Sequence, residues 1–196
     1  MNSEVVFAYA RMNPPTEGHR KLFDDVNKAA LETGGKPFIV LSRSSGDAKN
    51  PLSAAKKFHH ASKIIGDGPM VLATADYPSP VHWLSFLYDK MGYKRLTIVC
   101  GTDRVDQYHQ IVDRCHGKDF NFWSYRYVIG ERSHVSGTAA RKAVSDGNFE
   151  AFLKLYPNTR HEYVRDLYDD LVISQPINRP KSRVKNGNTY QDKATG

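Results

Sequence analysis

Short apolar runs alternate along the chain with stretches in which apolar residues recur every three to four positions. In the first helical stretch, Leu22, Phe23, Val26, Ala29 and Ala30 fall on one face. Apolar runs predict buried β-strands at residues 5–10, 37–41, 70–74, 95–100 and 120–129. A first helix is predicted to end before Gly34, a short helix is predicted within residues 135–145, and further helices are predicted over residues 54–65, 80–91, 103–115, 148–155 and 162–171.

This repeated strand–helix alternation predicts an α/β fold, a Rossmann-like doubly wound parallel sheet of about five strands with helices on both faces. In such sheets, ligands bind at the carboxyl ends of the strands, near the point where the strand order reverses. Residues 11–19, 101–104 and 130–141 each follow a predicted strand. We therefore expect these three segments to meet at one edge of the sheet.

The segment after the first strand carries the clearest chemistry in the chain. Two prolines, Pro14 and Pro15, force a turn directly before the first helix. Thr16 and His19 then lie at the start of that helix, where free backbone N–H groups favour anions. The pattern is typical of a phosphate-binding turn.

Two motifs resemble the signatures of the nucleotidyltransferase superfamily, whose members transfer nucleotides to nicotinamide mononucleotide, phosphopantetheine and other acceptors. Residues 16–19 (Thr-Glu-Gly-His) fit the first signature, [His/Thr]-x-Gly-His. Residues 136–141 (Ser-Gly-Thr-Ala-Ala-Arg) fit the second, near Ser-x-Thr-x-x-Arg, with Gly137 where a hydroxyl residue is commoner. The resemblance covers roughly residues 4–156 and extends to divergent members encoded by large bacteriophages.

The resemblance implies specific roles for three catalytic candidates. His19 is expected to contact the α-phosphate of a nucleoside triphosphate and to stabilise the transition state, while Arg141 holds the β- and γ-phosphates. The Thr16 hydroxyl can donate to a phosphate oxygen but supplies no positive charge. We therefore expect Arg11, Lys57 or Mg²⁺ to supply that charge.

The other nucleotide-binding candidates lie beside these motifs or after other strands. Gly101 and Asp103 resemble a Gly-x-Asp segment that lines the base or ribose in many relatives. Lys57, on the helix after the second strand, is expected to face the triphosphate. The full set is Arg11, Asn13, Gly18, Lys57, Gly101, Asp103, Ser136 and Thr138.

These features predict an enzyme that transfers a nucleoside monophosphate, AMP from ATP, to a phosphate-bearing small molecule such as nicotinamide mononucleotide, releasing pyrophosphate. Mg²⁺ is expected to arrive on the triphosphate, because the sequence shows no metal-ligand spacing. A cytidylyltransferase and a phosphopantetheine adenylyltransferase-like enzyme stay open as alternatives. So does a non-catalytic module that binds nucleotides or nucleic acid.

Charge and composition also predict a basic C-terminal tail and a cellular compartment. The net charge is +7, of which residues 175–196 carry +4, so we expect a domain over residues 1–174 and a flexible basic tail that contacts nucleic acid weakly. No apolar run approaches the ~20 residues that span a bilayer, so no membrane contact is expected. The two cysteines form no disulfide framework, which favours the cytoplasm, or the host cytoplasm for a phage protein. A homo-oligomer stays open.

Overall fold

The protein is built around a five-stranded, wholly parallel β-sheet. The computed structural model describes residues 3–130 and 135–174. The strands are β1 (Glu4–Ala10), β2 (Lys36–Leu41), β3 (Met70–Leu72), β4 (Arg95–Gly101) and β5 (Ser124–Gly130). They lie in the order β3-β2-β1-β4-β5, and each neighbouring pair is parallel. The predicted Rossmann-like α/β fold is confirmed.

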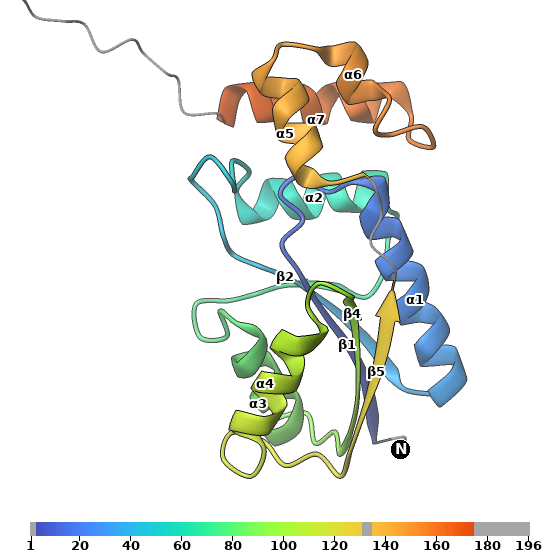
Figure 1. Cartoon of the computed structure of the whole chain (residues 1–196), viewed down its shortest axis with the longest axis vertical. Coiled ribbons are helices and arrows are strands. Elements are labelled where there is room, and N and C mark those ends of the chain that lie inside the picture. Colours follow the sequence, from blue (N-terminus) through green and yellow to red (C-terminus); the bar gives the residue numbers. More distant parts are fainter. Residues whose placement is uncertain (1–2, 131–134, 175–196) are drawn as a thin grey trace, which may run out of the picture.

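Helices cover both faces of the sheet and its upper end (Figure 1). They are α1 (Glu17–Thr33), α2 (Ala54–Ile64), α3 (Pro80–Asp89), α4 (Val105–Cys115), α5 (Gly137–Ser145), α6 (Phe149–Leu153) and α7 (His161–Ser174). Helix α1 lies on one side of the sheet and α3 with α4 on the other, while α5, α6 and α7 lie beyond the carboxyl ends of the strands (Figure 1).

Strand β1 is buried on both faces, as expected for a central parallel strand. Val6 and Ala8 pack into the core shared with α1, α2 and the C-terminal helices, whereas Val5 and Phe7 pack into the core shared with α3 and α4. The chain runs outward from β1 to β2 and β3, then returns to the other side of β1 with β4. The switch point therefore lies between the carboxyl ends of β1 and β4.

The last strand begins later than the apolar run predicts. Phe120 and Phe122 are buried, but Gly117 donates its backbone N–H to the Phe120 carbonyl at 2.8 Å, which closes a turn there. The ladder with β4 starts only at Ser124. In this segment the aromatic side chains are buried although the backbone is not yet paired with β4. The hydrophobic pattern therefore predicts the burial but not the start of the strand.

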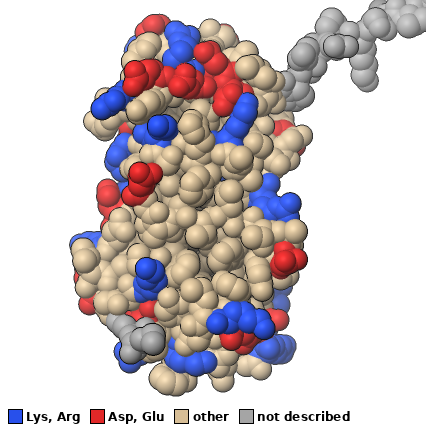
Figure 2. Space-filling model, turned by 180° about the vertical axis from the view of Figure 1, so that it is seen from behind, with Lys and Arg blue, Asp and Glu red and all other residues tan. Residues whose placement is uncertain are grey.

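On the face shown in Figure 2, charged side chains of both signs are scattered among uncharged residues, with acidic groups gathered at the end where the C-terminal helices lie. Among the described residues, no helix is both long and apolar enough to cross a membrane. Cys100 and Cys115 are buried free thiols. The basic tail predicted for residues 175–196 lies outside the described residues.

Candidate active site

A cleft of about 630 Å³ opens at the carboxyl ends of β1, β4 and β5. Its walls come from the loop after β1, the start of α1, the loop after β4, the end of β5 and the start of α5. Ten of the eleven residues singled out from the sequence line it: Arg11, Asn13, Thr16, Gly18, His19, Gly101, Asp103, Ser136, Thr138 and Arg141. The expected meeting of three loops at one sheet edge is what the structure shows.

The loop after β1 is held by its own buried polar groups. Met12 is buried with a positive φ of 45°, and the Asn13–Pro14 peptide bond is cis. The Asn13 side chain accepts from the Leu52 backbone N–H at 2.9 Å and donates to the Leu52 carbonyl at 2.9 Å. Asn13 therefore ties this loop to the segment before α2.

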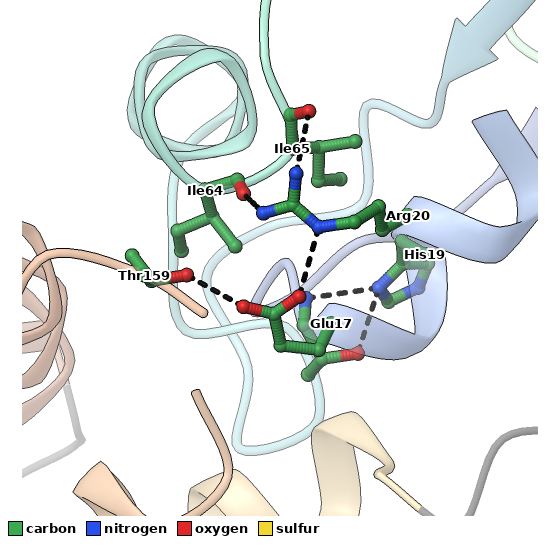
Figure 3. A network of polar contacts seen from close by, with 7 residues as sticks. Glu17, His19, Arg20, Ile64, Ile65 and Thr159 are labelled. Atoms are coloured by element: carbon green, nitrogen blue, oxygen red, sulfur yellow. Dashed lines mark hydrogen bonds and ion pairs between the residues drawn. The ribbon is translucent and has the colours of Figure 1, made fainter. Parts of the chain in front are cut away.

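The contacts of His19 determine which ring nitrogen carries its proton. The backbone N–H of Thr16 donates to Nδ1 of His19 at 3.0 Å, and the Thr16 hydroxyl oxygen lies 3.0 Å from the same nitrogen. An amide N–H can only donate, so Nδ1 must accept and the proton of the neutral ring lies on Nε2. Nε2 has no partner among the described residues, which leaves one N–H donor available in the cleft (Figure 3).

His19 is also held in its neutral form. Burial of the ring lowers the pKa of His19 to about 4, and the positive charge of Arg104 acts in the same direction. At neutral pH the residue is therefore a hydrogen-bond donor without a charge.

A titration of His19 followed by NMR should show a midpoint near pH 4 rather than the ordinary value of 6.5. Between these values the unfolded chain binds more protons than the folded one, so the free energy of unfolding should fall as the pH is lowered through this window. The variant His19→Gln should lose that part of the acid sensitivity. A midpoint near 6.5 would contradict a ring that is neutral at pH 5 to 6.

Arg141 joins the second motif to the first. Its Nη1 donates to the carbonyl oxygen of Asn13 at 2.5 Å, and its Nη2 donates to the Thr138 hydroxyl at 3.1 Å. A Cβ at position 137 would lie 3.2 Å from Nη1 and 3.6 Å from that carbonyl, so Gly137 leaves room for this contact. Ser136 begins α5 by accepting from the backbone N–H of Ala139 at 3.2 Å.

Lys57 does not reach the cleft, contrary to the expectation from the sequence. It is fully buried, and its ammonium group donates to the carbonyl oxygens of Ser42 and Ser44, the latter at 3.0 Å. The neighbouring Lys56 pairs with Asp170 at 2.7 Å on the far side of α2. The buried lysine therefore fixes the loop after β2, and burial lowers its pKa to about 8.

Other cations occupy the place foreseen for Lys57. Arg104 and Lys49 line the cleft with Arg11 and Arg141, and none of the four forms a salt bridge with a described carboxylate within 4.0 Å. Burial, and next the charge of Arg11, lower the pKa of Arg141. These positive charges line the same cleft and repel one another, so a bound polyanion would relieve the repulsion.

Two glycines line the cleft where β4 and β5 end. Gly101 and Gly130 pair in register at the ends of β4 and β5. A Cβ at Gly130 would lie 2.6 Å from the Asp25 carboxylate, which forms an ion pair with Lys21 at 2.9 Å. Sequence inspection missed Lys21 and Asp25, which pair with each other at i,i+4 on α1 and also line the cleft.

A second cavity of about 480 Å³ adjoins the cleft. The two share Tyr9, Arg11, Asp103 and Arg104. The Ser42 and Ser44 segment, which Lys57 holds in place, contributes its outer wall. Two ligands could therefore bind side by side, with Arg11 and Arg104 between them.

Comparison with known proteins places this arrangement among solved folds. A bifunctional NMN adenylyltransferase/ADP-ribose pyrophosphatase from Francisella tularensis, solved with AMP and a manganese ion, superposes with a TM-score of 0.56 at 15% identity. The match covers 87% of this chain and 52% of that one. A Vibrio parahaemolyticus protein described as a nicotinate-nucleotide adenylyltransferase gives 0.53 at 14% identity, covering 85% of this chain and 99% of that one. The chain shares the α/β fold of these two proteins.

Sequence comparison adds one short match. ATP sulfurylase 2 of Arabidopsis thaliana is 34% identical over 88 residues, which cover 41% of this chain and 18% of that protein. No model of a protein family matches the chain. The chain thus spans about half of the Francisella enzyme and a smaller part of the sulfurylase. These comparisons establish the fold that the chain shares with the two solved proteins.

Proposed function

We propose that the protein is a nucleotidyltransferase that transfers AMP from ATP to a small molecule bearing a phosphate. The observation that carries this proposal is the bond between Arg141 and the Asn13 carbonyl. It joins Asn13, just before the first motif, to the second motif across 128 residues, and it does so in the cleft that also holds the free Nε2–H of His19 and three further cations. A triphosphate needs this combination of donors and positive charges.

The reaction is a single in-line displacement at the α-phosphorus. An oxygen of the acceptor forms a bond to that phosphorus while the bond to the bridging oxygen of the β-phosphate breaks, and pyrophosphate leaves with the electron pair. The Nε2–H of His19 donates to a non-bridging α-phosphate oxygen. Arg141 holds the β- and γ-phosphates throughout the reaction, so it binds ATP and also offsets the negative charge of the leaving pyrophosphate.

A neutral His19 suits this chemistry because the attacking phosphate oxygen is already an anion. The reaction therefore needs no general base, and the low pKa of His19 keeps the ring as a donor across the physiological range. The Thr16 hydroxyl, which donates to the Val135 carbonyl at 3.4 Å, helps to orient the ring. We infer that Arg11, Arg104 and Lys49 supply the cations that Thr16 does not.

Magnesium belongs to the substrate in this proposal. Among the described residues, no group of three or more His, Cys, Asp or Glu side chains could hold a metal ion. The ion would therefore enter on the triphosphate, as Mg–ATP, and neutralise charge on the phosphates. The protein's own residues orient that complex.

The second cavity is the proposed acceptor site. Arg11 and Arg104 face both cavities, so the acceptor phosphate would lie between them, beside the α-phosphate of the bound nucleotide. The names of the Francisella and Vibrio proteins support adenylyl transfer to a pyridine mononucleotide, and nicotinamide mononucleotide is the first acceptor to test.

Pyrophosphate release gives the test. The purified chain would be incubated with ATP or CTP and, in turn, nicotinamide mononucleotide, nicotinate mononucleotide, phosphopantetheine and sulfate. Release that needs both ATP and one phosphorylated acceptor would support the proposal. ATP binding by calorimetry without release from any pair would favour a non-catalytic nucleotide-binding module, and preference for CTP would make it a cytidylyltransferase.

A further inference from the structure

We propose that the turn between α6 and α7, residues 156–159, positions the phosphate-binding loop, with Tyr156 and Thr159 holding the two residues that flank Thr16. The role of these residues in the reaction depends on the proposed adenylyl transfer. Their contacts with the loop are independent of it. The turn belongs to the C-terminal helices, which lie beyond the sheet (Figure 1).

Tyr156 holds the residue before Thr16. Its ring is fully buried, and its hydroxyl donates to the Pro15 carbonyl at 2.8 Å, across 141 residues of sequence. This hydrogen bond fixes the position of the Pro15 carbonyl, and with it the backbone of the loop just before Thr16. Loss of that donor would leave the carbonyl unsatisfied in an apolar setting.

Thr159 holds the residue after Thr16. Its hydroxyl donates to one oxygen of the Glu17 carboxylate at 2.7 Å, while Arg20 donates to the other oxygen at 2.9 Å (Figure 3). The Glu17 side chain is only 9% exposed, so its charge depends on these partners. Arg20 continues the network by donating to the carbonyl oxygens of Ile64 and Ile65 at the end of α2.

The position of Thr16 is therefore fixed from both sides. The backbone N–H of Thr16 determines which nitrogen of His19 carries the proton. A shift of the loop would therefore change the orientation and the protonated nitrogen of the ring that faces the α-phosphate in the proposed reaction. Glu17 stands at the variable position of the first motif, yet it carries the contact to the turn. Tyr156 and Thr159 are positioning residues, because they act through Pro15, Glu17 and Thr16 rather than on the substrate.

Two variants, Tyr156→Phe and Thr159→Val, test this role. Each removes one hydrogen bond, and we expect kcat to fall by about 3- to 10-fold with the KM for ATP nearly unchanged. The variant Thr159→Ser keeps the hydroxyl and should retain the wild-type kcat. Tyr168→Phe is the matched control, since Tyr168 packs in the same layer against Phe149 and Phe152 but its hydroxyl has no partner among the described residues.

A second readout separates positioning from plain stability and does not require activity. NMR of the His19 ring nitrogens should show a changed environment in Tyr156→Phe and Thr159→Val, but not in Tyr168→Phe. A lower melting temperature with unchanged kcat and unchanged His19 signals would overturn the inference. If the wild-type chain released no pyrophosphate from any pair, the proposed function would fail, and the His19 signals alone would still decide the role of the turn.

Discussion

Replacing His19 with alanine should lower kcat by about 10²- to 10³-fold while the KM for ATP changes little. In the proposed reaction, the Nε2–H that His19 leaves unpaired among the described residues donates to the α-phosphate, and this hydrogen bond strengthens as charge develops there. Because the ring is neutral, it adds little to ground-state attraction for ATP. The loss is therefore expected in kcat, measured by pyrophosphate release under saturating substrates.

The control for this variant is His59→Ala, which removes an exposed histidine on α2 outside the cleft. It should retain wild-type kcat. His19→Ala also frees the Thr16 N–H from its acceptor, so the melting temperature of both variants should be compared. A His19→Ala enzyme with most of its kcat would show that another group stabilises the transition state.

Replacing Arg141 with alanine should lower kcat/KM for ATP by about 10²-fold, chiefly through a higher KM. The guanidinium offers charged donors to the β- and γ-phosphates, and these are present in the ground state as well as in the transition state. Arg141→Lys should recover part of the loss, since a lysine keeps the charge but not the planar pair of donors. Steady-state kinetics with varied ATP measures both variants.

Arg126→Ala provides the matched control for Arg141→Ala. Arg126 lies on β5 and pairs with Glu32 at 3.1 Å, with more than half of its side chain exposed (52%). Its loss should leave kcat/KM within about twofold of wild type, because exposed ion pairs contribute little. Equal losses in the two variants would point to a general effect of net charge and would contradict a specific phosphate contact by Arg141.

The fold could be predicted because periodicity reports burial, and burial fixes the layers. The parallel sheet and the meeting of its loops follow from apolar runs that alternate with amphipathic helices. Phe120 and Phe122 mark the limit of that reasoning. Their apolar character is a property of the side chains, whereas the start of β5 depends on backbone pairing with β4 that no local pattern reveals.

The site was predictable where motifs fix both residue and local backbone, as at His19 and Arg141. The site was not predictable where a long side chain can extend in more than one direction from its helix. Lys57 had the right residue type and helix, but its ammonium group turns under the Ser42–Ser44 segment. Arg104 lines the cleft beside the expected Asp103 and supplies a positive charge there, which Lys57 does not. Tyr156 and Thr159 gave no signal at all, since their partners lie about 140 residues away in the chain.

Transfer of isotopic label from ATP tests the central claim most directly. The protein would be incubated with each acceptor of the panel in turn and with ATP labelled with ³²P at either the α- or the γ-phosphate. We predict that the α-label appears in the acceptor product and the γ-label in pyrophosphate. Label from the γ-position in the acceptor or in orthophosphate would contradict nucleotidyl transfer and would show attack at the terminal phosphate instead.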